Sequence, residues 1–309
     1  MILGIDTSNY TTSVALYDDK NNIAYNFKKL LPVKVGEKGL RQSDAVFHHT
    51  MQIRELLKEA FNITTDISSV GVSVSPCDDE KSYMPCFMVG QTVAEAISGT
   101  LNANLFTFSH QRGHVAAALY SCNKLNLINE KFIAFHFSGG TSDALIVTTD
   151  DEKIIKCDVI ARSSDLKAGQ AIDRAGVLLG LPFPCGKYID ELAVNSSAEF
   201  KIKPSFDGLN PSFSGVENKC IKMHNEGACN EDIAKYTISY TLSVVDKMTE
   251  MILNKFGQLP LIYAGGVMSN SIIRKYMTDK YDCSFAEPQY SSDNAVGIAV
   301  LAALKEKQI

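Results

Sequence analysis

The same strand–turn–strand layout occurs twice in the chain, and this repeat constrains the fold more than any other feature. The first copy, "MILGIDTSNYTTSVALYDD", starts at Met1, and the second, "KFIAFHFSGGTSDALIVTTD", starts at Lys131. In each copy a turn rich in Ser, Thr or Gly separates two β-rich runs. Backbone N–H groups of two such turns that face one cleft can hold the phosphates of a nucleotide. The repeat therefore predicts two related halves around a nucleotide cleft.

Helical and β-rich runs alternate along the rest of the chain, which favours an α/β fold. We expect a strand at "VGVSVS", helices at "QTVAEAISGTL" and "DIAKYTISYTLSVVDKMTEMILNKF", and a strand from Leu261 to Ala264. The segment 201–232 is rich in loop-forming residues. An amphipathic helix is predicted from near Asp44, with apolar positions at Val46, Met51, Ile53, Leu56, Leu57 and Phe61.

The composition is that of a globular protein. The 309 residues, 45% hydrophobic and 21% charged, are enough for two units that each bury a core. A net charge of −5 argues against a chain that binds nucleic acid unaided, so a nucleic-acid substrate would need help from a partner. The first residues lack a basic region, and no apolar run approaches about 18 residues, so we expect a cytoplasmic protein without a membrane span.

The eight cysteines include no C-x-x-C pair and are expected to be reduced thiols. Cys77 and Cys86 bracket one loop and are the pair most open to redox chemistry.

Two histidines, His110 and His114, lie four residues apart in "SHQRGHVAAALY", at the head of a run with helical character. This spacing places both imidazoles on one helix face, where they can reach one ion. It is not an H-E-x-x-H protease signature, because Gln111 cannot act as the general base. Asp293, at a loop-to-helix junction, is either a further ligand or the N-cap of the last helix. The spacing alone leaves a metal pair and ordinary histidines both open.

Two glycine-containing turns, "HFSGGTSD" (136–143) and "AGGVMSN" (264–270), are candidates for phosphate binding. Adjacent glycines between strands also make ordinary hairpin turns. In "AIDRAGVLLGLPFPCGKYIDELA", Asp173 and Asp190 are candidate acceptors for sugar hydroxyls, or acids that face solvent.

Taken in order, these stretches resemble the tRNA threonylcarbamoyladenosine transferases (TsaD/Kae/Gcp type), formerly labelled O-sialoglycoprotein endopeptidases. The resemblance implies an α/β fold of the two-lobed actin/sugar-kinase/Hsp70 type with a nucleotide cleft between the lobes. The lobes are expected at 1–131, with a helix of about 294–309 packed on it, and at 132–293. The matching motifs are "ILGIDTS", "SHQRGHVAAAL", "FSGGTSDALIV", "AIDRAGVLLGLPFPCG", "PSFSG", "YAGGVMSN" and "YSSDNAVGIAVLAA".

The resemblance also implies site residues and ligands, namely one divalent metal ion (Fe or Zn) and an ATP/AMP-type nucleotide. His110, His114 and Asp293 would bind the metal ion, and His136 is a further candidate because some members have a tyrosine ligand there. The phosphate and threonylcarbamoyl site would be lined by His136, Phe137, Ser138, Gly139 and Gly140, with the last three stabilising oxyanion charge through backbone N–H groups. The adenosine contacts would come from Asp173, Gly186, Asp190 and Asn270.

The reaction implied is transfer of threonylcarbamoyl from its mixed anhydride with AMP to N6 of adenosine 37 in tRNA. A cation beside the phosphate would stabilise the leaving AMP, and positioning of the weakly nucleophilic amine would contribute much of the rate. Family members work with an ATPase subunit and other small proteins, which are the expected partners beside tRNA.

Three departures from the family pattern indicate a divergent paralog. The turn "TSNYTTS" lacks the family's Asp-Glu pair, which leaves Asp6 as a candidate substitute for proton removal. The loop "SPCDDEKSYMPC" replaces a Gly-rich loop, and Thr141 replaces His or Asn after the double glycine. Two alternatives therefore stay open: carbamoyl or acyl transfer to another acceptor, and nucleotide binding without turnover.

Overall fold

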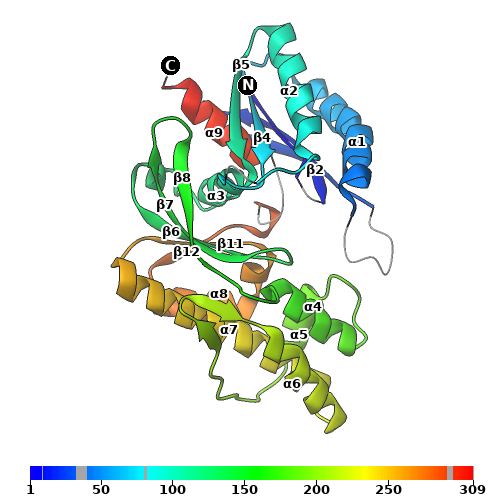
Figure 1. Ribbon diagram of the computed structural model, residues 1–309, viewed down its shortest axis with the longest axis vertical. Helices are drawn as coiled ribbons and strands as arrows, with labels where there is room; N and C mark the ends of the chain where they lie inside the picture. Colours follow the sequence, from blue (N-terminus) through cyan, green and yellow to red (C-terminus); the bar gives the residue numbers. More distant parts are fainter. Residues whose placement is uncertain (9, 33–39, 80–81, 291–294, 309) are drawn as a thin grey trace. The chain divides into compact units, whose positions relative to one another are not determined.

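The computed structural model describes residues 1–8, 10–32, 40–79, 82–290 and 295–308 (Figure 1). The chain folds into two compact units. The predicted lobes differ from these units at Lys131, which belongs to the second unit, and at residues 148–157 and 289–290, which belong to the first. The first unit comprises Met1–Glu130, Thr148–Cys157 and Gln289–Ile309, and the second comprises Lys131–Val147 and Asp158–Pro288.

The first unit is built on a five-stranded sheet with the order β3-β2-β1-β4-β5. Strand β1 pairs antiparallel with β2 and parallel with β4, and β4 pairs parallel with β5. The two strands predicted at the start of the chain are confirmed as β1 and β2. The strands are β1 (Ile2–Asp6), β2 (Thr11–Asp18), β3 (Ile23–Leu30), β4 (Ser69–Ser75) and β5 (Asn104–Ser109).

Helix α9 packs on this sheet, where it contacts β1, β2 and β4 as well as helix α3 (Figure 1). The contact with β1 is close enough to require glycine, since a Cβ on Gly4 would lie 2.4 Å from the carbonyl oxygen of Ala295. The helices of this unit are α1 (Gln42–Ile63), α2 (Phe87–Leu101), α3 (His110–Ser121) and α9 (Val296–Glu306).

The face that α1 buries matches the predicted apolar face at Ile53 and Leu56 and departs from it elsewhere. Met51 is 56% exposed, whereas the polar residues His49 and Gln52 are buried. Thr12 on β2 explains this exchange, because its hydroxyl hydrogen-bonds His49 Nδ1 and Gln52 Oε1, both at 2.8 Å. Buried polar groups are tolerated when they are hydrogen-bonded in this way.

The sheet of the second unit has the order β12-β11-β6-β7-β8. It reproduces the first sheet strand for strand: β6 pairs antiparallel with β7 and parallel with β11, and β11 pairs parallel with β12. The structure thus confirms the internal repeat. The strands are β6 (Phe132–Phe137), β7 (Ser142–Asp150), β8 (Ile154–Arg162), β11 (Leu261–Ala264) and β12 (Cys283–Phe285), and a separate hairpin is formed by β9 (Ser205–Asp207) and β10 (Asn210–Ser212).

Five helices accompany this sheet, and α7 is the long helix predicted from the sequence. The predicted loop-rich segment 201–232 is only partly irregular, since it contains the β9–β10 hairpin and α6. The helices are α4 (Ala168–Leu178), α5 (Gly186–Val194), α6 (Ser214–Asn225), α7 (Asn230–Phe256) and α8 (Ser271–Lys280).

Within the described residues no helix is long and apolar enough to cross a membrane. All eight cysteines, including Cys77 and Cys86, are free thiols.

Asp165 organises the "PSFSG" motif between β10 and α6. Its carboxylate accepts hydrogen bonds from Ser212 Oγ at 2.5 Å and from the backbone N–H groups of Phe213 and Ser214 at 2.9 and 3.0 Å. Burial alone would raise the pKa of Asp165, but these hydrogen bonds outweigh it and lower the pKa to about 2.

We expect Asp165→Asn to destabilise the protein at pH 7 by about 1 kcal/mol, a value that allows for solvent screening of this exposed carboxylate. A lowered folded-state pKa stabilises the fold above the ordinary value of 3.8 and loses this effect as the pH falls through about 2. The difference between variant and wild type should therefore shrink from pH 7 to pH 2 in urea unfolding. Asp207→Asn, on an exposed strand residue nearby, is the control, and equal stability of Asp165→Asn and wild type at pH 7 would contradict the expectation.

Candidate functional site

Helix α3 presents His110 and His114 side by side. The helix begins at His110 because the Ser109 hydroxyl caps it, accepting a hydrogen bond from the backbone N–H of Arg112 at 3.4 Å. The two imidazole rings have centroids 4.2 Å apart and planes at 74°. The predicted helical spacing thus brings the two imidazoles together at the first turn of α3.

A buried carboxylate lies on one side of His110. Asp6 Oδ2, at the end of β1, is 2.8 Å from His110 Nδ1, and the Asp6 side chain is only 2% exposed. The other oxygen, Oδ1, accepts hydrogen bonds from Ser73 Oγ at 2.6 Å and from the backbone N–H of Ser8 at 3.0 Å. The sequence left Asp6 as a candidate to remove a proton from the substrate amine. Because both of its carboxylate oxygens accept hydrogen bonds and are buried, Asp6 is not placed for this role.

The two histidines have the donor chemistry and proximity that a transition-metal site requires. Asp293, the third predicted ligand, lies outside the described residues, and His136 lies on β6 in the second unit. In the parts of the chain that the structure describes, no group of three or more His, Cys, Asp or Glu side chains could hold a metal ion. His110 and His114 therefore fit a metal site as two of its ligands, and the complete ligand set stays a prediction.

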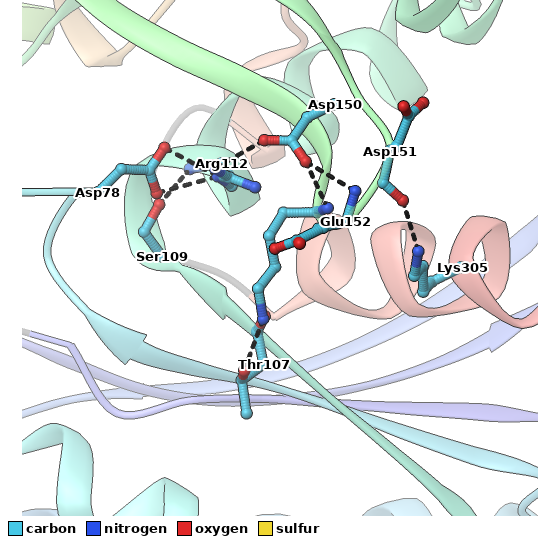
Figure 2. Close-up of polar contacts among 9 residues, drawn as sticks. Asp78, Thr107, Ser109, Arg112, Asp150, Asp151, Glu152 and Lys305 are labelled. Atoms are coloured by element: carbon cyan, nitrogen blue, oxygen red, sulfur yellow. Dashed lines mark hydrogen bonds and ion pairs between the residues drawn. The ribbon is translucent and has the colours of Figure 1, made fainter.

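Between the two histidines, Arg112 anchors α3 to two loops of the first unit (Figure 2). Its guanidinium Nε donates to both oxygens of Asp78 at 2.8 and 2.9 Å, and Nη2 lies 3.4 Å from Asp150 Oδ2. Asp150 is the last residue of β7, and in the turn that follows it Lys153 donates to the carbonyl oxygen and hydroxyl of Thr107 at 2.8 and 2.9 Å. Burial, followed by the charge of Arg112, lowers the pKa of Lys153. The loop that carries Asp78 is thus held against α3 by one buried cation.

We expect Arg112→Met to destabilise the protein by about 2–3 kcal/mol, because it leaves two partly buried carboxylates without their cation. Arg112→Lys should recover less than half of this, since an ammonium cannot contact two carboxylates in the same geometry. Urea unfolding measures both effects. Arg174→Met, which removes an exposed ion pair with Glu217, is the control and should cost less than about 0.5 kcal/mol; a similar small cost for Arg112→Met would show that the network is not stabilising.

The second unit contains a cavity of about 450 Å³. Five of the residues predicted to bind nucleotide line it, and three helices begin at its wall: α4, α5 and α8. Helix N-termini favour anionic ligands through their free N–H groups and their dipoles. The lining residues are Gly139, Gly169, Ile172, Asp173, Pro184, Gly186, Lys187, Asp190, Ile238, Gly266, Val267, Ser269 and Asn270.

Asn270 presents an unused donor in the wall of this cavity. Its Oδ1 caps α8 by accepting a hydrogen bond from the N–H of Ile273 at 3.0 Å. Its Nδ2 has no hydrogen-bond partner among the described residues, although the residue is only 7% exposed. A buried amide without a partner is costly, so this group is well suited to donate to a ligand.

The two acids of the cavity have different surroundings. Asp190 accepts hydrogen bonds from the N–H and the hydroxyl of Ser271, at 3.0 and 2.9 Å, and so helps to fix the start of α8. Asp173 accepts one from the N–H of Cys185 at 2.8 Å, and burial raises its pKa. Asp173 thus has acceptor capacity left for a ligand hydroxyl.

Comparison with known proteins identifies the family. The model of the tRNA N6-adenosine threonylcarbamoyltransferase (TsaD) family matches residues 38–300. The chain belongs to this family. A "probable bifunctional tRNA threonylcarbamoyladenosine biosynthesis protein" of Methanocaldococcus jannaschii is 25% identical over 99% of this chain, and the chain spans 55% of that relative's length.

Solved structures of the same fold include sugar kinases. Component A of (R)-2-hydroxyglutaryl-CoA dehydratase from Acidaminococcus fermentans aligns with a TM-score of 0.60 at 17% identity, over 99% of this chain and 98% of the other. A ROK family glucokinase from Streptomyces griseus aligns with a TM-score of 0.55 at 12% identity, over 98% and 99%. These similarities confirm the two-lobed α/β fold of the actin and sugar-kinase type for this member of the threonylcarbamoyltransferase family.

The double-glycine turn of this family member uses most of its own donors. The N–H of Ser138 donates to the Thr141 carbonyl at 2.8 Å, and the N–H of Gly140 donates to Ser138 Oγ at 3.2 Å. Of the three backbone N–H groups predicted to bind oxyanion charge, those of Ser138, Gly139 and Gly140, only that of Gly139 has no acceptor among the described residues. Gly169, at the start of α4, presses on this turn, since a Cβ there would lie 2.6 Å from Gly139 N.

The other predicted residues of the β6 segment have different positions. Phe137 is fully buried in the core of the second unit, so its side chain is a packing residue. His136 is partly buried, and its ring lies against Gly265, where a Cβ would be 2.8 Å from His136 Cδ2. Neither residue lines the cavity.

Sequence reasoning missed several residues of these sites. Ser73, which holds Asp6, lies at the end of a strand and carries no sequence signal of its own. Lys187 and Gly169 line the cavity because they follow the starts of α5 and α4. The start of α5 at the predicted Gly186 was the available signal for Lys187.

Proposed function

We propose that this chain transfers threonylcarbamoyl from threonylcarbamoyl-AMP to N6 of adenosine 37 in tRNA, with a bound divalent metal ion. The family match over residues 38–300 carries the proposal. The name of the M. jannaschii relative, a tRNA threonylcarbamoyladenosine biosynthesis protein, supports it.

The cavity of the second unit is suited to the AMP part of the donor. Apolar side chains of Ile172, Ile238 and Val267 can pack on a base, and Asn270 Nδ2 can donate to one of its ring nitrogens. Asp173 can accept a ribose hydroxyl, and the N-termini of α4 and α5 favour the phosphate.

The transfer chemistry would divide between two groups of residues. His110, His114 and Asp293 would hold the metal ion, which supplies Lewis-acid stabilisation of phosphate charge when bound. The N–H of Gly139, in the wall of the cavity, would donate to oxyanion charge that develops as the amine attacks the carbonyl. With Asp6 engaged elsewhere, we assign no acidic general base, and positioning of donor and acceptor contributes the larger part of the rate.

The deciding experiment is a transfer assay with the purified chain, threonylcarbamoyl-AMP, unmodified tRNA and the family's partner proteins. Threonylcarbamoyladenosine in the digested tRNA supports the proposal. Consumption of the donor without modified tRNA would instead support transfer to another acceptor. Tight AMP binding without any consumption would support a nucleotide-binding protein without turnover.

We expect Asn270→Asp to weaken AMP binding about 10- to 100-fold, because it replaces a buried donor with an acceptor at nearly equal volume. The aspartate keeps the oxygen that caps α8, so the fold should be preserved. Calorimetric titration with AMP measures the effect. Asn195→Asp, on an exposed residue at the end of α5, is the matched control; equal affinity of Asn270→Asp and wild type would place the nucleotide elsewhere.

A further inference from the structure

We propose that Asp6 is a positioning residue for metal binding: it holds His110 in the tautomer whose lone pair is on Nε2, the nitrogen that would bind the ion. This inference rests on the proposed function, since it concerns the metal ion that this function includes. It adds to the predicted ligand set a residue that does not touch the ion. Carboxylates commonly orient metal-binding histidines in this way.

The chemistry of the pair determines which atom carries the proton. Oδ1 of Asp6 already accepts two hydrogen bonds, and a carboxylate oxygen accepts, so we infer that His110 Nδ1 donates to Asp6 Oδ2 across their 2.8 Å contact. In the neutral imidazole the lone pair is then on Nε2, the nitrogen away from Asp6.

The carboxylate cannot easily rotate away from this role. Ser73 Oγ and the Ser8 N–H both donate to Oδ1, which leaves Oδ2 for His110. Ser73 lies on β4, and Ser8 lies in the turn after β1. Asp6 itself is the last residue of β1, where it pairs with Ser13 of β2. The His110 ring is limited on other sides by the rings of His114 and Phe87, with centroids 4.2 and 6.3 Å away. A side chain held on so many sides is preorganised for an ion at Nε2.

The same contacts make Asp6→Asn a sharp test. The two donors at Oδ1 fix the asparagine carbonyl oxygen there, so its NH2 group takes the place of Oδ2 and faces His110. An NH2 donor stabilises the opposite tautomer, with the lone pair on Nδ1 and the proton on Nε2. The volume is nearly unchanged, but the nitrogen meant for the metal is blocked.

Zinc titration of the metal-free full chain, by calorimetry, gives the first readout. We expect Asp6→Asn to bind zinc about 10- to 100-fold more weakly than wild type. His114→Ala, which removes a direct ligand, should bind more weakly still. Asp143→Asn, which alters a buried carboxylate paired with Arg162 in the second unit, is the control and should bind zinc like wild type.

The second readout is ¹⁵N NMR of histidine-labelled, metal-free protein, with the His110 signals assigned from His110→Ala. We expect the wild type to carry its proton on Nδ1 of His110 and Asp6→Asn to carry it on Nε2. Wild-type protein with the proton on Nε2 would overturn the inference, even if the variant failed to fold.

Equal zinc affinity of Asp6→Asn and wild type would also overturn the inference and leave the proposed function intact. A wild-type chain that binds no zinc would overturn the metal part of the proposed function, and the NMR result would decide separately what Asp6 does to His110.

Discussion

Replacing both His110 and His114 with alanine is expected to reduce threonylcarbamoyl transfer by about a thousandfold or more. The variant loses the two histidines that we propose as metal ligands, and the Lewis-acid effect of a bound cation is worth several kcal/mol in the transition state, at about 1.4 kcal/mol for each factor of ten. Single-turnover rates with threonylcarbamoyl-AMP and unmodified tRNA measure the chemical step. Bound metal per chain, measured on the same preparations, should fall with the rate.

The matched control is His224→Ala, on an exposed position of α6, which should change neither rate nor metal content. AMP binding should survive in the double variant, because the cavity that we assign to the nucleotide belongs to the second unit. A double variant that still modifies tRNA at the wild-type rate would show that these histidines serve no metal in catalysis.

The substitution Gly297→Ala, which adds a single methyl group, is expected to destabilise the protein by about 3 kcal/mol. Helices α3 and α9 cross at this residue, where a Cβ would lie 1.8 Å from the carbonyl oxygen of Gly113 and 2.6 Å from the N of Ala117. Both of these atoms belong to the backbone of α3, so no rotamer change can relieve the overlap. Gly297→Ala must move one helix away from the other, and urea unfolding measures the cost.

Gly99→Ala is the control for this substitution. Gly99 lies on α2, also in a helix, but nothing lies within 4 Å of an added Cβ. Alanine there should stabilise the protein by about 0.5–1 kcal/mol, because it reduces the freedom of the unfolded chain. If Gly297→Ala were as stable as wild type, α3 and α9 would not be in close backbone contact at this residue.

The fold was largely predictable because its signals are local or repeated. The strand–turn–strand copies at Met1 and Lys131 became β1–β2 and β6–β7, and the complete order of the two sheets is the same. Hydrophobic periodicity located α7 and the strand Leu261–Ala264. On α1 it located the buried Ile53 and Leu56 but missed His49 and Gln52, because their burial depends on hydrogen bonds with Thr12, which lies on a strand far away in the sequence.

The sites were less predictable because they join distant residues. The helical spacing of His110 and His114 is a local pattern, but the contact of His110 with Asp6 spans 104 positions of sequence. Likewise, Asn270 lines a cavity with Gly139 and Asp173 from separate segments, and only the family resemblance grouped them beforehand. The hairpin-turn alternative for the adjacent glycines was the one sequence indication that the donors of Ser138 and Gly140 would be used within their own turn.

The first unit draws on both ends of the chain, and this affects how the protein is made on a ribosome. Helix α9, which covers β1 and β4, follows the whole second unit in the sequence and is therefore synthesised after it. Until α9 is made, the face of the first sheet at Gly4, on which α9 packs, is exposed to water. Exposed apolar surface of this kind is what chaperones bind. The second unit, almost continuous in sequence, has no such delay. We expect the second unit, with its cavity, to fold before α3 gains its contacts with α9.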